Sequence, residues 1–254
     1  MTAPAAWQPV DCHAHTRMSD GALEPSELVT LVRSRGVRPS IADHLTRDIR
    51  GAPSSVEEVE RYLDEVERHD VFRGGEFCWQ DSLWRELPGE LFARFTHRLG
   101  SLHAVFLPDG SVMHAFSSPW PDGLDPETYM DAHLENLERF AREMPVEILA
   151  HPTLLPMALR KRPLEELWTE AREERAVAAL ARAGIAFEIS NRYRPHERFV
   201  ARAIAGGVRI SLGSDGHTAQ QVGDLAWPLA LARRLGARDD ELYDPLVHGK
   251  RDVS

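Results

Sequence analysis

The sequence has few cysteines and no long apolar run. Only Cys12 and Cys78 are cysteines among its 254 residues, which excludes a disulfide-rich secreted scaffold and favours a reducing compartment. No apolar run approaches the roughly 20 residues that span a bilayer, so no membrane partner is expected. Residues 1–10 show no charged stretch followed by an apolar segment, and no signal peptide is visible. We therefore expect a cytoplasmic protein.

Basic residues are also scarce relative to acidic ones. The chain has 30 Lys and Arg against 40 Asp and Glu, a formal net charge of -10. Faces that bind long nucleic acids usually carry clustered Lys and Arg, so such a partner is not expected. A small anionic substrate remains compatible, because a local site can oppose the net charge. The sequence leaves the oligomeric state unknown.

Short apolar runs alternate with longer amphipathic stretches along the chain. The runs predict seven strands, at residues 7–12, 37–42, 71–78, 99–106, 146–150, 185–189 and 208–212. The longer stretches predict helices at residues 25–35, 55–67, 127–143, 164–183, 197–205 and 219–235. Repeated β–α units indicate a parallel sheet covered by helices, and the length suits one α/β barrel. We predict a single domain over residues 1–254, with a core at about 7–236 and a flexible tail at 248–254.

Metal-capable side chains lie at or near the end of almost every predicted strand. Because the carboxyl ends of parallel strands meet on one face of a barrel, these side chains should converge there. His13 and His15 can point to the same side of an extended chain, and Asp215 and His217 repeat this spacing. The strand-end residues are His13, His15, Asp43, His44, Glu76, His103, His151, Glu188, Asp215 and His217.

Other residues have simpler interpretations. A lone histidine is more often a surface or hydrogen-bonded residue than a ligand, and we expect His133, in a charged helix, to be solvated. Asp43 could be a ligand or could orient a histidine that is one. Glu188 could support the site or could be a buried carboxylate bonded to the backbone. Cys12 and Cys78 are expected to be small core residues, although a cysteine beside a metal site could be a soft ligand.

Eight motifs follow one another in a fixed order. They are VDCHAHT at 10–16, MSDG at 18–21, IADH at 41–44, GE at 75–76, GSLH at 100–103, AHP at 150–152, FEIS at 187–190 and GSDGH at 213–217. HxH alone is a weak signal, but this ordered series resembles the PHP (polymerase and histidinol phosphatase) family. The resemblance covers about residues 10–235. It implies a distorted TIM-like (β/α)7 barrel, in agreement with the seven predicted strands.

The resemblance also implies a centre of two or three divalent ions, typically zinc, manganese or iron. The implied ligands are His13, His15, Asp20, His44, Glu76, His103, His151, Asp215 and His217. Among them Glu76 would bridge two ions, and Glu76, Asp215 and His217 would be catalytic. At Asp20 some members have a histidine nearby instead, which leaves open whether the third site is filled. Asp43 would support the ligands.

Such a centre suits phosphoester hydrolysis. Three dications would exceed the charge of the three carboxylates, attract phosphate and supply a metal-bound hydroxide as the attacking group. Arginine binds phosphate oxygens through two parallel hydrogen bonds, and Arg160, Arg192 and Arg194 lie in loops that could provide such a clamp. We therefore predict a phosphatase acting on a small phosphorylated metabolite. Histidinol phosphate is the first candidate.

Three alternatives stay open. The first is a nucleotide phosphodiesterase or 3′-end exonuclease of the same family, and the second is a metal-binding or regulatory module without catalysis. The third is an amidohydrolase of similar barrel type, which commonly uses a carboxylated lysine between its metals. The only lysines, Lys161 and Lys250, fall in a predicted loop and tail, which disfavours the third alternative.

Overall fold

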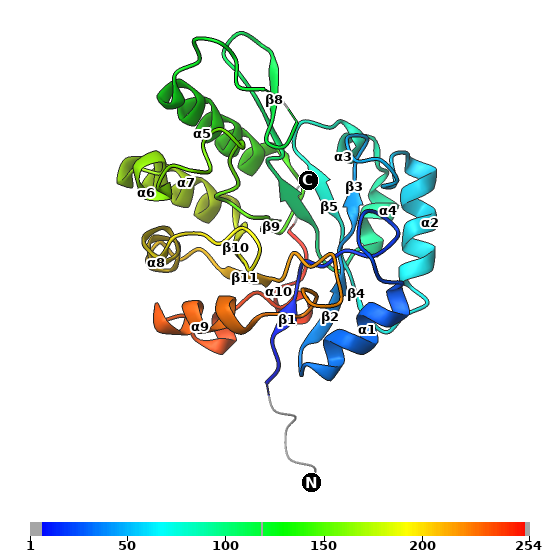
Figure 1. Ribbon diagram of the computed structural model, residues 1–254. Coiled ribbons are helices and arrows are strands. Elements are labelled where there is room, and N and C mark those ends of the chain that lie inside the picture. The colour runs from blue at the N-terminus through cyan, green and yellow to red at the C-terminus, as the bar shows by residue number, and fades with distance from the viewer. Residues whose placement is uncertain (1–6, 118, 252–254) are drawn as a thin grey trace.

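A computed structural model describes residues 7–117 and 119–251 as a ring of short strands surrounded by helices (Figure 1). The strands are β1 Val10–Asp11, β2 Arg38–Ile41, β3 His44–Leu45, β4 Phe72–Arg73, β5 Glu76–Cys78, β6 Leu99–Ser101, β7 Ala104–Phe106, β8 Val112–His114, β9 Ile148–Leu149, β10 Ala186–Ser190 and β11 Ile210–Gly213. The helices are α1 Pro25–Ser34, α2 Val56–Val66, α3 Leu83–Glu86, α4 Gly89–Arg94, α5 Pro126–Glu143, α6 Leu164–Leu167, α7 Glu170–Ala183, α8 Glu197–Ala205, α9 Ala226–Arg234 and α10 Pro245–His248.

The strands pair in chain order and almost all in parallel. One ladder runs β3-β5-β6-β9-β10-β11 and another runs β1-β2-β4, and only β7 and β8 pair antiparallel. The first and last strands meet through an isolated parallel bridge between Ala14 and Gly216 and a hydrogen bond from the Cys12 amide to the Leu212 carbonyl. This arrangement confirms the predicted α/β class with a distorted, TIM-like parallel barrel. The hydrogen bonding falls in separate short ladders and does not form one closed sheet.

Two predicted strands are interrupted, and the interruptions distort the barrel. The run at 71–78 divides into β4 and β5 at Gly74 and Gly75. A Cβ at Gly74 would meet the Ile41 carbonyl and the Ala42 side chain, so only glycine lets these neighbouring strands approach so closely. The run at 99–106 divides into β6 and β7, and β7 leaves the barrel to form a hairpin with β8 that the sequence analysis missed.

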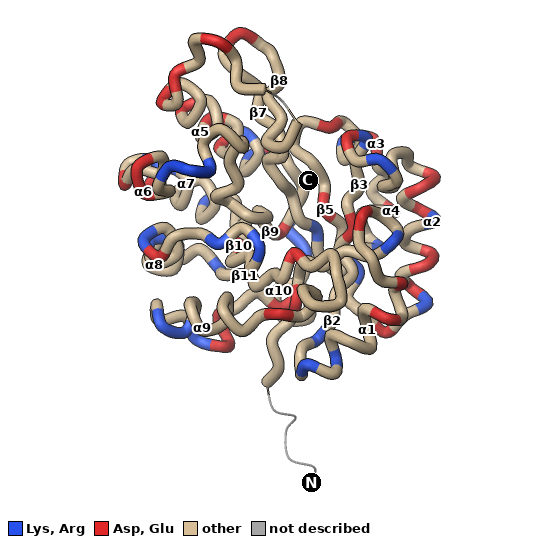
Figure 2. Tube along the Cα trace, viewed as in Figure 1, with Lys and Arg blue, Asp and Glu red and all other residues tan. Residues whose placement is uncertain are grey.

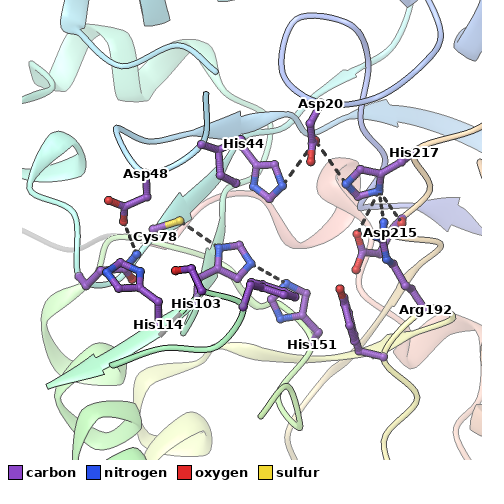
Figure 3. Close-up of a pocket in the computed structure, with 15 residues that line it drawn as sticks. Asp20, His44, Asp48, Cys78, His103, His114, His151, Arg192, Asp215 and His217 are labelled. Atoms are coloured by element: carbon purple, nitrogen blue, oxygen red, sulfur yellow. Dashed lines mark hydrogen bonds and ion pairs between the residues drawn. The ribbon is translucent and has the colours of Figure 1, made fainter. Parts of the chain in front are cut away.

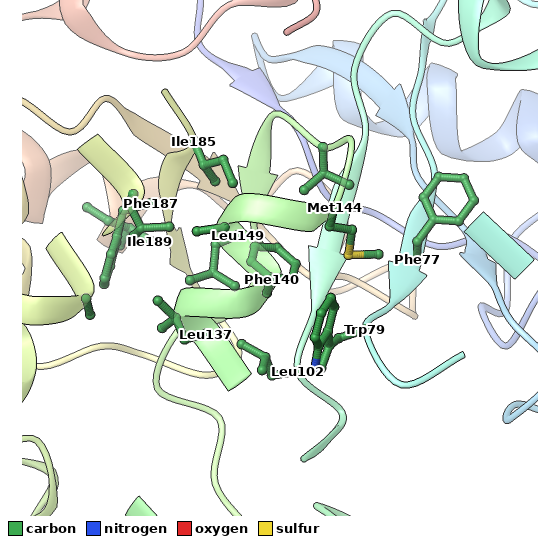
Figure 4. Close-up of a cluster of buried hydrophobic side chains, with 14 of the residues drawn as sticks. Phe77, Trp79, Leu102, Leu137, Phe140, Met144, Leu149, Ile185, Phe187 and Ile189 are labelled. Atoms are coloured by element: carbon green, nitrogen blue, oxygen red, sulfur yellow. The ribbon is translucent and has the colours of Figure 1, made fainter. Parts of the chain in front are cut away.

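The helices pack through the apolar faces that the sequence predicted. Between α5 and the strands lies a buried cluster that includes Phe77, Trp79, Phe140, Phe187 and Ile189 (Figure 4). Trp79 anchors this layer, because its indole N–H donates to the side-chain oxygen of Asn136 on α5 at 2.9 Å. Burial of such large aromatic side chains stabilises the side of the barrel that carries β5, β9 and β10.

Other boundaries differ from the prediction. The expected helix at 164–183 is two helices, because the backbone turns at Trp168 and the Thr169 side chain caps α7. The expected helix at 219–235 begins only at Ala226, and residues 219–223 form turns. His133 was expected to be solvated. It is only 1% exposed, because α7 and the ring of Trp168 cover α5. The helices α3, α4 and α10 were not predicted.

The last described residues close the amino-terminal end of the barrel. Tyr243 is buried with Cys12 and Ala42, and its amide donates to the carbonyl of Ile210, where β11 begins. A flexible tail was predicted from residue 248. Within it, the amide of Arg251 donates to the buried carboxylate of Glu147 at 2.9 Å, while residues 252–254 lie outside the described residues.

Charged residues are spread over many elements of the outer surface. Figure 2 shows Lys and Arg interleaved with Asp and Glu on the helices. Many of these charges form exposed ion pairs, such as Arg175 with Glu138 and Arg233 with Asp239. No helix of the described ranges combines the length and the apolar character that crossing a bilayer requires.

Candidate metal centre

The nine predicted ligands meet at the carboxyl ends of the strands. Six of them line a cavity of about 350 Å³ (Figure 3), namely Asp20, His44, His103, His151, Asp215 and His217. The other three, His13, His15 and Glu76, are fully buried beside it. The parallel strand order therefore brings together residues that are up to about two hundred positions apart in the chain.

Four groups of possible ligand atoms form within this assembly, with the atoms of each group within 4.8 Å of one another. The groups are His15, Asp20, His44 and His217; His13, Glu76 and His151; His13, His15 and Asp215; and His44, Glu76 and His103. His13, His15, His44 and Glu76 each belong to two groups. Because one side-chain atom seldom serves two ions and four of the nine residues are shared, the set suits two or three ions better than four.

Glu76 lies between the groups. Its Oε1 is 3.0 Å from Nε2 of His151 and 3.4 Å from Nε2 of His103. Its Oε2 is 2.6 Å from Nδ1 of His44 and 3.4 Å from Nε2 of His13. Each carboxylate oxygen thus faces two histidine nitrogens, and Glu76 belongs to two of the four groups, so it would be shared between ions bound there.

Several polar atoms at the centre have no hydrogen-bond partner although they are buried. They include Nδ1 of His15, Nδ1 of His151 and Oδ2 of Asp215. The Nε2 atoms of His13 and His15 also face each other at 3.1 Å. Buried polar atoms are normally paired, so this concentration of unpaired nitrogen and oxygen atoms needs an explanation. Divalent ions such as zinc would satisfy these atoms, and the mixed imidazole and carboxylate donors fit such ions.

The protonation states of Glu76 and His103 suit metal ligands. Burial opposes ionisation of Glu76, but the neighbouring His44 and His103 rings hold the pKa of this carboxyl well below its usual range. Burial lowers the pKa of His103 to about 3. At neutral pH Glu76 is therefore a carboxylate and His103 a neutral imidazole, the forms in which these side chains bind metal.

The backbone is strained at two of the ligands. His151 has a φ of 31° and Asp215 a φ of 50°, and no other non-glycine residue of the described ranges has positive φ. Hydrogen bonds hold both turns, because the His151 amide donates to Oε2 of Glu188 at 2.6 Å and the Asp215 amide donates to the His13 carbonyl at 2.8 Å. Strain held in this way is typical of functional sites.

Two buried carboxylates support the ligands in different ways. Glu188, whose role the sequence left open, contacts Nδ1 of His13 through Oε1 at 2.8 Å, which leaves Nε2 of that ring to face the centre. Asp43 was expected to be a ligand or to orient a histidine. Its carboxylate instead accepts hydrogen bonds from the amide and hydroxyl of Thr16 and from the hydroxyl of Ser19, so it holds the turn that leads to Asp20.

The three candidate arginines lie in different places. Arg192 lines the cavity, with Nη1 2.6 Å from Nδ1 of His217. Cζ of Arg160 lies 4.9 Å from the ring centre of Phe116. Because Phe116 lines the cavity, Arg160 lies at the rim of the cavity. Arg194 does not line it, because its guanidinium bonds to Asn191 and stacks over Trp227.

The cavity wall contains residues that the sequence analysis did not single out. They are Asp48, Ile49, Gln80, Phe116 and Ser117, and His114, which the sequence places in a loop that could flank a site, lines the cavity with them. His114 ends β8 and Phe116 follows it, so both depend on the hairpin that was missed. The turn residues PDG at 108–110, placed between the apolar runs 104–107 and 112–113, are a signal that could have predicted this hairpin. Cys78, expected to be a core residue, also lines the cavity.

Comparisons with known proteins bear on the fold. No protein-family model matches the sequence, and no curated protein matches it. The structure is similar to the crystal structure of histidinol phosphate phosphatase from Lactococcus lactis subsp. lactis Il1403 complexed with zinc, L-histidinol and phosphate. The TM-score is 0.69 at 15% identity, and the match covers 91% of this chain and 95% of that chain.

A second solved structure is more distant. It is a proposed metal-dependent phosphoesterase from Bifidobacterium adolescentis ATCC 15703, with a TM-score of 0.36 and 16% identity over 95% of this chain and 98% of that chain. A TM-score this low carries no argument. The likeness to the Lactococcus phosphatase shows a shared fold, in agreement with the fold that the ordered motifs led us to expect.

Proposed function

We propose that this chain is a metal-dependent phosphoesterase of the PHP family that hydrolyses a small phosphomonoester. The observation that carries the proposal is the meeting of nine histidine and carboxylate ligands around Glu76, with unpaired buried atoms directed among them. The shared fold with a phosphatase crystallised with zinc and phosphate supports it.

The residues of the chain have distinct roles in this proposal. Divalent ions bound there would polarise the phosphoryl oxygens and activate water at neutral pH. Glu76 would hold the ions from the buried side, while Asp215 and His217 face the cavity where the phosphate would lie. Arg192, on the same wall, is positioned to bind phosphate oxygens, and Arg160 extends this positive charge to the rim.

The shape of the cavity favours a small substrate. Its volume of about 350 Å³ accommodates a phosphorylated metabolite, and the rings of Phe116 and Tyr193 form part of its wall. Histidinol phosphate is the first candidate, supported by the fold shared with a phosphatase that was crystallised with L-histidinol and phosphate.

The test is phosphate release from a panel of phosphoesters by protein loaded with zinc or manganese. The panel contains histidinol phosphate, nucleoside monophosphates, sugar phosphates and a short oligonucleotide, and Asp215→Asn is the control. Phosphate release from a monoester by the wild type, with no release by Asp215→Asn, supports the proposal. Hydrolysis of the oligonucleotide alone would favour the nuclease alternative, and no release from any compound by metal-loaded protein would contradict both.

A further inference from the structure

We propose that Cys78 is a positioning residue of the metal centre, which holds the ring of His103 so that Nε2 of that ring faces the ions. The proposal rests on the metal centre of the proposed function. Cys78 is the last residue of β5 and lies two positions after Glu76, so both side chains project from the same face of the strand. Sγ of Cys78 is 3.0 Å from Nδ1 of His103 (Figure 3).

The other nitrogen of the His103 ring points to the centre. Nε2 lies 3.3 Å from Nε2 of His151 and 3.4 Å from Oε1 of Glu76. A neutral imidazole that binds an ion through Nε2 carries its proton on Nδ1. That N–H then donates to Sγ of Cys78, and Oγ of Ser101, at 3.2 Å, is a second acceptor for it. The contact therefore fixes both the tautomer and the orientation of the ring.

The geometry favours this role over direct ligation by sulfur. Sγ lies at hydrogen-bond distance, 3.0 Å, from Nδ1 of His103, whereas the other ring nitrogen, Nε2, is the one that faces the centre. Across the residues that the structure describes, Cys78 also belongs to none of the four groups of possible ligand atoms.

His103 differs from His13 in the side chains that its Nδ1 contacts. His13 contacts the carboxylate of Glu188, whereas His103 contacts a thiol and a hydroxyl. Removal of Cys78 leaves the hydroxyl of Ser101 as the side-chain acceptor for the N–H at Nδ1 of His103. Loss of such a contact typically lowers metal affinity by about 10- to 100-fold.

The experiment is a titration of metal-free protein with Co²⁺, followed by absorption spectroscopy and by competition with a chelator. The variants are Cys78→Ala, Cys78→Ser and the control Cys12→Ala, which removes the other buried thiol. We expect Cys78→Ala to bind one Co²⁺ about 10- to 100-fold more weakly than the wild type. Cys78→Ser should bind within a few-fold of the wild type, because its hydroxyl can accept the same hydrogen bond.

Three results would overturn the proposal. Equal affinities in Cys78→Ala and Cys12→Ala would show that the contact does not position His103, while leaving the proposed function intact. A sulfur-to-cobalt charge-transfer band that disappears in Cys78→Ala would make Cys78 a ligand. A wild-type protein that binds no Co²⁺ would contradict the metal centre itself, and with it the role of Cys78.

Discussion

Glu188 and His13 form a fully buried carboxylate–imidazole pair, with Oε1 2.8 Å from Nδ1. The second oxygen of Glu188 accepts the amide hydrogen of His151 at 2.6 Å. One carboxylate on β10 therefore orients a histidine that follows β1 and the strained turn that follows β9. It connects ligands that follow two different strands, and it does not line the cavity itself.

Replacement of Glu188 by glutamine should weaken metal binding. The amide has one oxygen in place of two, so it cannot accept from both His13 and His151, and affinity should fall by about 10- to 100-fold. Competition with a chelator measures this change. The matched control is Glu173→Gln, which alters another buried carboxylate paired with a histidine, His196, outside the centre. Equal metal affinity in the two variants would contradict the role of Glu188.

A methyl group at Gly213 should disturb the same pair. A Cβ there would collide with Oε1 of Glu188 and would come close to Cβ of His13. We expect Gly213→Ala to lower the free energy of unfolding by about 1–3 kcal/mol and to weaken metal binding. Urea unfolding and chelator competition measure the two effects. Gly89→Ala is the control, because nothing lies within 4 Å of a Cβ at that position. Wild-type stability and metal affinity in Gly213→Ala would contradict the expected collision with Glu188 and His13.

Arg192 and Arg194 should differ in their effect on catalysis, although they are two residues apart. Loss of a charge-assisted contact to phosphate costs about 1.5–3 kcal/mol, so Arg192→Ala should raise KM roughly 10- to 100-fold. Arg194→Ala should change KM little, because its guanidinium stacks on Trp227 away from the cavity. Steady-state kinetics with a phosphomonoester compares them. A larger effect of Arg194→Ala would place the phosphate elsewhere.

The fold should lose stability in mild acid, in part through His133. Burial lowers the pKa of His133 to about 4, whereas the ring in an unfolded chain has a pKa of about 6.5. As the pH falls through this interval, protons bind the unfolded chain preferentially, so the stability lost between pH 8 and pH 5 is about 2 kcal/mol for this residue.

Urea unfolding of the wild type and of His133→Leu at both pH values isolates this contribution. The leucine does not titrate, so the variant should lose about 2 kcal/mol less between pH 8 and pH 5. Other buried groups, such as His97, contribute equally to both proteins. The same pH dependence in the two proteins would show that His133 is not held neutral in the folded state.

Most of the ligands could be predicted because they lie within or just after a recognisable apolar run. His13 follows β1 and Asp215 follows β11, and the parallel order of the strands suffices to bring them together. Their backbone and supporting contacts could not be predicted in the same way. The positive φ of His151 and of Asp215 depends on hydrogen bonds from residues distant in the sequence.

The cavity wall was harder to predict than its ligands. Phe116 and His114 reach the cavity only because β7 leaves the barrel and pairs with β8. Asp43 precedes His44 in a motif of ligand residues, yet its carboxylate accepts hydrogen bonds from Thr16 and Ser19. Tertiary packing determines which hydrogen-bond partner a side chain has, and local sequence patterns do not contain this information.

The central claim for this protein is metal-dependent phosphoester hydrolysis at the centre around Glu76. The decisive measurement is metal content and phosphatase activity on p-nitrophenyl phosphate before chelation, after chelation and after zinc or manganese is restored, in the wild type and in Glu76→Gln. We predict two or three ions per wild-type chain, activity lost on chelation and regained with metal, and fewer ions with little activity in the variant. Full activity in chelated protein, or in Glu76→Gln, would contradict the account.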